Sequence, residues 1–129
     1  MTNRVRVLIA DDHPSVRENL RYLVDAEGDM ECVGVAKDGL RCVDLCHEVA
    51  PQVLVLDGDM PGVDGLRVLR HLVRQLPDIQ IVMYTIESEI CEVARWQGAF
   101  ACVLKDAPYE MLIDAVRRAG YAPVGSETF

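Results

Sequence analysis

The sequence is short of basic residues, and this shortage restricts its partners. Lys and Arg number 13 against 21 Asp and Glu, which gives a formal net charge of −8. A surface that binds nucleic acid needs Lys and Arg clustered on one face. We therefore expect no direct nucleic acid binding by this chain; if DNA is involved, another domain binds it.

Long hydrophobic runs are also missing. Charged residues interrupt the apolar stretches within about ten residues, whereas a helix needs ~20 apolar residues to span a bilayer. The N-terminus does not have the basic and then apolar segments of a secretory signal. The sequence predicts a cytoplasmic protein that does not associate with a membrane.

The cysteines lack the spacing of a metal site. They are odd in number and include no CxxC pair, and no second ligand pair accompanies Cys42, Cys46 and His47, which are neighbours on a predicted helix. Buried free thiols are therefore expected at all five positions: Cys32, Cys42, Cys46, Cys91 and Cys102.

The length of the chain, 129 residues, suits one hydrophobic core but not two. The sequence has no repeats and no low-complexity segments. We expect residues 1–119 to form a single domain. Residues 120–129, GYAPVGSETF, have the composition of a linker or C-terminal tail, or alternatively pack back on the domain through Tyr121 and Val124.

Short apolar runs alternate along the chain with segments whose apolar residues have the periodicity of a helix. The runs predict strands at residues 5–10, 30–36, 52–57, 79–85 and 100–105. Strands that are apolar on both faces and joined through helices form a parallel sheet that is covered on both sides. We expect a doubly wound, flavodoxin-like α/β fold with five parallel strands in the order 2-1-3-4-5.

Polar residues stand at the carboxyl ends of four predicted strands. In strand order these are Asp11 and Asp12, then Asp57, Thr85 and Lys105. In open parallel sheets the ligand crevice lies outside the carboxyl ends of the strands. All five residues are therefore candidates for one site.

Three carboxylates at one edge would raise one another's pKa unless a cation lay among them. Mg²⁺ prefers oxygen ligands, and Asp12, Asp57 and a backbone carbonyl would supply them, with Asp11 acting through a water. Asp57 would then accept a phosphoryl group as a carboxylate nucleophile. The Lys105 ammonium and the Thr85 hydroxyl would surround the phosphate oxygens.

Each of these residues also has an ordinary structural alternative. Asp11 or Asp12 would cap the first helix, Thr85 would be a cap or a strand residue, and Lys105 would be a solvated charge. The combination of acids, a hydroxyl and an amine on four strand ends favours a common site.

Four runs at matching spacing resemble the receiver domain of bacterial two-component response regulators. They are DDHP at 11–14, LDGDMPGVDG at 56–65, MYT at 83–85 and LKD at 104–106. The resemblance covers residues 4 to 119. DDHP and LKDA are most similar to the subgroup whose output domain is a helix-turn-helix DNA binder.

The resemblance implies that a sensor histidine kinase donates a phosphoryl group to Asp57. Mg²⁺ would be held by Asp12, Asp57 and the main-chain carbonyl of Asp59, with Asp11 assisting. The chain would catalyse only its own phosphorylation and dephosphorylation. A C-terminal DNA-binding domain, absent from this chain, would be the output that controls transcription, and homodimer formation is left open.

The resemblance also implies a conformational change. Thr85 would move toward the phosphate, Lys105 would pair with it, and the surface of the fourth helix, fifth strand and fifth helix would shift. Met60-Pro61 and Gly65 would shape the loop after Asp57.

Three features depart from the family pattern. Residue 86 is normally small, whereas Ile86 would narrow access to the phosphate pocket and slow either phosphorylation by small donors or hydrolysis. Position 102 commonly carries Tyr or Phe as a rotating residue, whereas Cys102 cannot fill the space of a ring, so output would run through other contacts.

The third departure is negative charge at Asp59, joined by Glu87. Asp59 and Glu87 would tighten Mg²⁺ binding and oppose an anionic donor, or would be solvated rim residues. Trp96, near the end of the fourth helix, would either pack in the core or contact a partner.

Two alternative functions fit parts of the pattern. An Asp-nucleophile phosphatase of the haloacid-dehalogenase type would use the same residue types, but its nucleophile follows an early strand and no DD pair precedes it. A phosphorylation-independent receiver-like module would use the same fold only as a protein-binding surface, and Ile86 and Cys102 suit that alternative.

Overall fold

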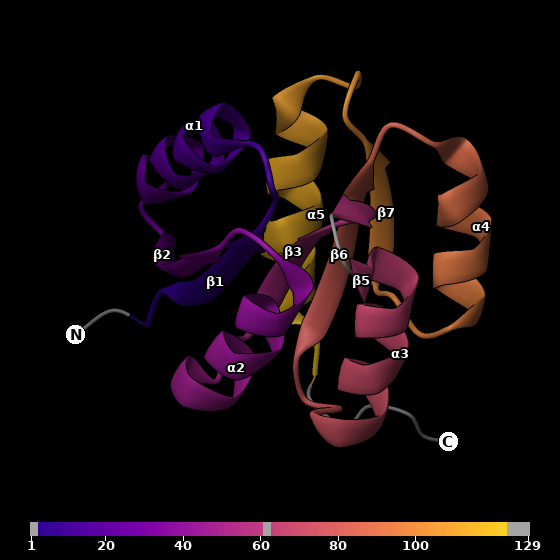
Figure 1. The fold of residues 1–129 in the computed structure, drawn as a ribbon. Helices are drawn as coiled ribbons and strands as arrows, with labels where there is room; N and C mark the ends of the chain where they lie inside the picture. Colours follow the sequence, from indigo (N-terminus) through magenta and orange to yellow (C-terminus); the bar gives the residue numbers. More distant parts are fainter. Residues whose placement is uncertain (1–2, 61–62, 124–129) are drawn as a thin grey trace.

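The computed structural model describes residues 3–60 and 63–123 (Figure 1). Its main sheet contains five parallel strands: β1 (Val5–Ala10), β2 (Met30–Ala36), β3 (Val53–Asp57), β6 (Gln80–Thr85) and β7 (Ala101–Leu104). They are arranged in the order β2-β1-β3-β6-β7. The predicted doubly wound fold with strand order 2-1-3-4-5 is confirmed.

Helices cover both faces of this sheet (Figure 1). The helices are α1 (Pro14–Asp25), α2 (Gly39–Val49), α3 (Gly65–Gln75), α4 (Ser88–Trp96) and α5 (Tyr109–Tyr121). Helices α1 and α5 pack on one apolar cluster, and α2, α3 and α4 on the other. None of the helices within the described ranges is long and apolar enough to cross a membrane.

The strands supply both clusters because successive side chains point to opposite faces. In β1, Val7 and Ile9 belong to the cluster under α1 and α5, whereas Leu8 and Ala10 belong to the other. A strand buried in this way on both faces reads as a continuous apolar run. This is why the sequence located all five main strands to within a residue at each end.

The helix starts follow from local chemistry. Pro14 occupies the first turn of α1, and the Asp38 carboxylate accepts a hydrogen bond from the Arg41 N–H at the start of α2. His13 is the N-cap residue of α1, so capping of this helix by Asp11 or Asp12 is not observed. The two acids are therefore left for another role.

The end of α5 lies at Tyr121, two residues beyond the end expected for the domain. The Tyr121 hydroxyl donates to Asp29 Oδ2 at 3.2 Å. Arg117 of the same helix donates to Asp29 Oδ2 at 2.8 Å and to Glu27 Oε1 at 2.6 Å. These contacts hold α5 against the turn between α1 and β2. Val124 lies outside the described residues.

The cysteine prediction is wrong for two of the five. Cys91 of α4 and Cys102 of β7 form a disulfide, with their Cα atoms 5.3 Å apart. Cys42 and Cys46 are buried free thiols as expected, and Cys32 is free but only half-buried. The pairing depends on α4 packing against β7, a tertiary contact that the spacing of the two cysteines does not reveal.

Candidate functional site: an acidic pocket at the carboxyl edge of the sheet

The ladder hydrogen bonds of the sheet position the predicted acids and the lysine. Asp57 is the last residue of β3, and Asp11 follows β1, where its N–H donates to the Ala36 carbonyl at 3.0 Å. Lys105 follows β7, and its N–H donates to the Thr85 carbonyl at 2.8 Å. The sheet thus brings three distant parts of the chain to one edge.

The side chains of Asp11, Asp57 and Lys105 form one cluster, in which the two acids are buried and the lysine is partly buried. Lys105 Nζ donates to Asp11 Oδ2 at 2.8 Å and lies 3.4 Å from Asp57 Oδ1. The Asp59 N–H also donates to Asp57 Oδ1, at 3.1 Å. Asp11 and Asp57 are only 1% and 3% exposed, so these charges are largely removed from water. Paired charges of this kind in a protein interior mark candidate functional sites.

Two carboxylate oxygens in the pocket lack a hydrogen-bond partner among the residues that the structure describes. They are Asp57 Oδ2 and Asp12 Oδ1, and both atoms are buried. Potential ligand atoms from Asp11, Asp12, His13 and Asp57 lie within 4.8 Å of one another. Because buried carboxylate oxygens are costly unless a donor or a cation satisfies them, this set fits a small, hard metal ion.

The pKa values of Asp57 and Lys105 reflect this crowding. Burial raises the pKa of Asp57 to about 6, and Asp11 adds to the rise, while the Asp59 N–H and Lys105 oppose it. Burial alone would lower the pKa of Lys105, but its contacts with Asp11 and Asp57 hold it above its ordinary value. Lys105 is thus a fixed positive charge, and the carboxylates exceed it in number.

Thr85 is fully buried but does not enter the cluster of carboxylates in this structure. Its hydroxyl accepts a hydrogen bond from the Glu87 N–H at 3.2 Å, just before α4. A Cβ added to Gly58 would lie 3.0 Å from Thr85 Oγ1, so this hydroxyl adjoins the residue after Asp57. Thr85 therefore occupies the position expected from the sequence while also making the local turn contact of the structural alternative.

The loop after Asp57 forms a small antiparallel ribbon, β4 (Asp59–Met60) and β5 (Val63–Asp64). It leads directly to Gly65, where an added Cβ would lie 2.6 Å from the Asp57 carbonyl. The close backbone approach explains why glycine stands there. Pro61, the other residue expected to shape this loop, lies outside the described residues.

The expected rim residues face solvent. Ile86 is 73% exposed, and Asp59 and Glu87 are also exposed. Trp96 is 91% exposed at the end of α4, so it does not pack in the core. The effects proposed for Ile86, Asp59 and Glu87 stay predictions, as does Mg²⁺ coordination by the Asp59 carbonyl.

Two residues of the pocket were not predicted from the sequence. His13 Nδ1 lies 3.2 Å from Asp11 Oδ1 and 3.1 Å from Asp12 Oδ1. Lys105 Nζ lies 5.6 Å from the ring centre of Tyr84, a cation–π contact that limits where the ammonium can move. Both stand next to predicted site residues in the chain, and this adjacency is the signal that would have found them.

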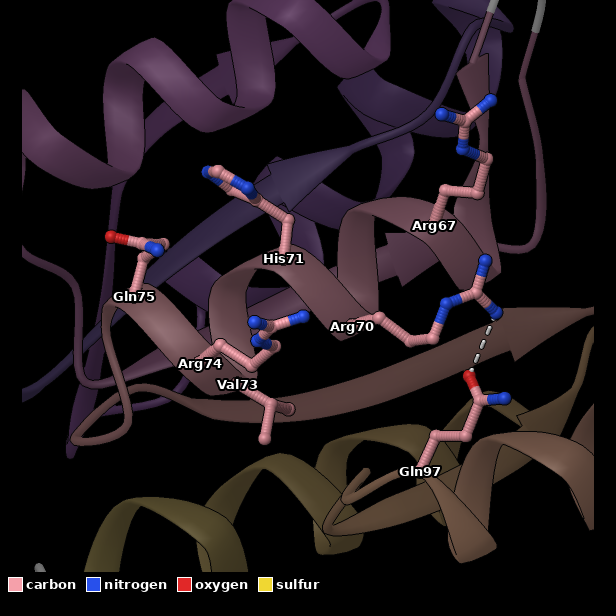
Figure 2. Close-up of a pocket in the computed structure, with 7 residues that line it drawn as sticks. All are labelled: Arg67, Arg70, His71, Val73, Arg74, Gln75 and Gln97. Carbon is pink, nitrogen blue, oxygen red and sulfur yellow. Dashed lines mark hydrogen bonds between the residues drawn. The ribbon is translucent and has the colours of Figure 1, made fainter.

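A second hollow lies on the outer side of α3 and has the opposite charge (Figure 2). Its volume is about 650 Å³, and Arg67, Arg70, His71 and Arg74 contribute to its lining. Arg70 donates to Gln97 Oε1 at 3.1 Å across its edge. None of the predicted site residues lines it, so the chemistry predicted from the sequence belongs to the acidic pocket alone.

The strand order and the acid cluster with its paired lysine define a receiver-type α/β domain. Residues 7–117 match the family model of the response regulator receiver domain, and the chain belongs to this family. Two solved structures support the assignment. A LuxR-family two-component response regulator from Aurantimonas sp. has a TM-score of 0.86 and 28% identity, covering 92% of this chain and 86% of that one. The response regulator domain of Thermotoga maritima CheB also has a TM-score of 0.86, with 27% identity, covering 94% and 99%.

Curated relatives give a consistent result. The chain is 38% identical over 120 residues to the uncharacterized transcriptional regulatory protein YxjL of Bacillus subtilis, covering 91% of this chain and 55% of the relative. It is 38% identical over 117 residues to the response regulator GacA of Pseudomonas aeruginosa, covering 88% and 54%. The chain thus spans about half the length of these relatives. Membership of this family removes the reason for considering a haloacid-dehalogenase phosphatase.

Proposed function

We propose that this chain is a phosphoacceptor domain in which Asp57 receives a phosphoryl group with the help of Mg²⁺. The observation that carries the proposal is the buried Asp57 Oδ2, which has no partner among the described residues and lies in a cluster of acids paired with Lys105. A carboxylate oxygen without a hydrogen bond is free to act as a nucleophile.

Each residue of the pocket has a role in this proposal. Asp11, Asp12 and Asp57, with the Asp59 carbonyl, would hold the metal, and His13 is a further potential ligand. Bound Mg²⁺ supplies positive charge that offsets the carboxylates and the incoming phosphate. The Asp59 N–H and Lys105 Nζ both contact Asp57 Oδ1 and orient the carboxylate. Lys105 would pair with the phosphate oxygens, and Thr85 would approach them after releasing the Glu87 N–H.

Membership of the family supports a proposal for the donor and the output of this domain. A sensor histidine kinase would supply the phosphoryl group from a phosphohistidine. The curated relatives, which are about twice as long, include a transcriptional regulatory protein and a response regulator. We infer that this domain works in the cytoplasm, that it controls transcription through a DNA-binding domain, and that it catalyses no reaction beyond phosphorylation and dephosphorylation of Asp57.

A phosphorylation-independent interaction module is the second candidate. Cys102 favours it, because this residue is held in a disulfide instead of providing a mobile aromatic side chain. The complete acid cluster and the paired lysine favour phosphorylation, because an interaction surface alone would not need buried acids that lack partners.

Beryllofluoride, which mimics an acyl phosphate, separates the two candidates. Trp96 is the only tryptophan, and its position at the end of α4 makes its fluorescence a reporter of that helix. We expect a Mg²⁺-dependent, saturable change with the native chain and none with Asp57→Asn. An unaltered fluorescence spectrum with beryllofluoride, with no adduct by mass spectrometry, would favour the interaction module.

Mg²⁺ titrations of Asp59→Asn and Glu87→Gln would show whether these rim charges strengthen metal binding.

Ile86 provides a separate test of access to the pocket. If its exposed side chain narrows the entrance, Ile86→Ala will accelerate phosphorylation by acetyl phosphate, hydrolysis of the phosphorylated form, or both. Unchanged rates for both reactions would show that Ile86 does not restrict access.

A further inference from the structure

The disulfide between Cys91 and Cys102 joins two elements that connect to the acidic pocket. Cys91 lies in α4 and Cys102 in β7, 11 residues apart in sequence. Within the described part of the chain, strand β7 lies at the edge of the sheet and pairs only with β6. Both cysteines are half-buried, so small solutes can reach this side of the molecule. The bond thus ties a surface helix to an edge strand.

Backbone contacts connect this bond to the pocket. Helix α4 begins after Glu87, whose N–H donates to Thr85 Oγ1 at 3.2 Å. Strand β7 leads to Lys105, whose N–H donates to the Thr85 carbonyl at 2.8 Å. The disulfide therefore closes a ring that runs from Thr85 through α4, across the sulfur atoms, and along β7 to Lys105.

Side-chain packing adds a second connection. Ile90, the residue before Cys91, lies close to Gly58 and Thr85. A Cβ added to Gly58 would lie 3.1 Å from Ile90 Cδ1 and 3.0 Å from Thr85 Oγ1. Ile90 and Thr85 therefore border the same narrow space beside Gly58, which has no room for a side chain, and we expect a shift of Thr85 or Gly58 to affect the first turn of α4. Cys91 lies in the same part of the helix.

We propose that Cys91 and Cys102 are a reversible oxidation site at which a peroxide creates the bond that fastens α4 to β7. One thiol loses its proton, and its thiolate attacks an oxygen of hydrogen peroxide; the O–O bond breaks, a sulfenic acid forms, and the departing hydroxide takes up that proton as the first water. The second thiol loses its proton in turn, and its thiolate attacks the sulfenic sulfur; the S–S bond forms, and the departing hydroxide takes up the proton as the second water. The two sulfurs lose two electrons and the peroxide gains two. A dithiol reductant reverses the change by thiol–disulfide exchange and becomes a disulfide itself.

The other cysteines differ from this pair in position. Cys42 and Cys46 are buried in α2, and Cys32 lies in β2 with its Sγ 3.4 Å from the Gly34 carbonyl oxygen. None of the three bridges two elements. Cys32 is half-buried like the pair, so Cys32→Ser is a matched control for general thiol oxidation.

The direct test compares the peroxide-treated and dithiol-reduced chains. Peptide mapping of the oxidised form should recover one linked pair containing Cys91 and Cys102, with the loss of two hydrogen atoms. Amide hydrogen exchange in α4 should be severalfold slower in the oxidised form. Cys32→Ser should respond like the native chain, and Cys91→Ser should exchange at the reduced rate under both treatments. Failure to recover the linked pair, or equal exchange in both forms, would overturn the proposal.

A consequence for signalling rests on the proposed function of Asp57. If phosphorylation requires α4 to move, the oxidised form should bind beryllofluoride and Mg²⁺ about tenfold more weakly than the reduced form. Equal affinity in the two forms would overturn this coupling. If neither form binds beryllofluoride, the proposed function is contradicted, whereas the exchange of α4 amides still decides whether the oxidation site restrains this helix.

Discussion

Asp57 is held in an environment that disfavours its own charge. The carboxylate is almost fully buried beside Asp11, and Lys105 is shared between the two acids. Such an arrangement costs stability as long as no cation is bound, because a buried carboxylate loses its hydration. The folded chain is thus less stable than it would be without this buried charge, and one carboxylate oxygen of Asp57 stays available.

Replacing Asp57 by Asn should stabilise the chain when divalent cations are absent. The pKa of Asp57 is about 6 in the folded state, against 3.8 for an ordinary Asp. Between these values the unfolded chain loses its proton first, so the free energy of unfolding falls as pH rises, and the full cost is present above pH 6. At pH 7 we expect a gain of about 1–3 kcal/mol for Asp57→Asn.

Thermal or urea unfolding in the presence of a chelator measures this gain. The difference between Asp57→Asn and the native chain should shrink as pH is lowered from 6 to below 3.8, where the carboxyl group is protonated in both states. Asp59→Asn is the matched control, because Asp59 is exposed. A variant less stable than the native chain at pH 7 would show that Asp57 is well satisfied in the folded state.

The elements differ in how their ends are secured. Helix α5 is held by Arg117, which contacts Asp29 and Glu27 near the start of β2. Among the described residues, Arg118 on the same helix pairs only with Asp114, one turn away. The first contact links distant parts of the chain, and the second lies within one helix. Their energetic contributions should differ accordingly.

Arg117→Ala should lower the free energy of unfolding by about 1 kcal/mol, and Arg118→Ala by less than about 0.5 kcal/mol.

Hydrogen bonding to Arg117 holds the pKa of Asp29 below its ordinary value. The stabilisation from Asp29 is therefore present above pH 3.8 and is lost as pH falls through the depressed pKa. Urea unfolding of the two variants at pH 7 and pH 3 measures both effects. Equal losses for the two variants would contradict the assigned difference.

The disulfide is a second contact that secures one element against another, because it joins α4 to β7. It closes a loop of 11 residues, which in the chain-entropy description stabilises the fold by about 2–3 kcal/mol. Unfolding of the native chain with and without a dithiol reductant should show this loss, and Cys91→Ser should match the reduced native chain. A midpoint insensitive to the reductant would show that the bond adds no stability.

The sequence predicts some elements better than others for physical reasons. The strands were located because each is a short apolar run buried on both faces, as in residues 53–57. The two-residue strands β4 and β5 are too short to show any period, and they were missed. The Cys91–Cys102 pair was also missed, because neither cysteine stands in a pattern and the pairing depends on how α4 packs on the sheet.

The parallel topology of the whole sheet brings the residues of the acidic pocket together. Asp11, Asp57 and Lys105 come from three strands, and they meet because parallel strands direct their carboxyl ends to one edge. The sequence could predict that these three residues meet, because it predicted the strand order, but it could not predict the contacts between their side chains. The shared Lys105 and the buried oxygens of Asp12 and Asp57 depend on side-chain directions that the sequence does not specify.

Metal binding should change the stability of the entire domain. A cation that binds the folded chain alone stabilises it by about 2.7 kcal/mol at a hundredfold excess over its Kd. Mg²⁺ should therefore raise the unfolding midpoint of the native chain, and Asp12→Asn should reduce the increase. Identical shifts in both proteins would show that Mg²⁺ acts elsewhere.

Phosphorylation of Asp57 is tested most directly by peptide mass spectrometry after incubation of the reduced chain with Mg²⁺ and acetyl phosphate. We expect one phosphoryl group on the peptide that contains Asp57, retained in Asp59→Asn, and lost in Asp57→Asn or when the metal is chelated. A phosphoryl group on another residue, or none on the native chain with Mg²⁺ present, would contradict this expectation.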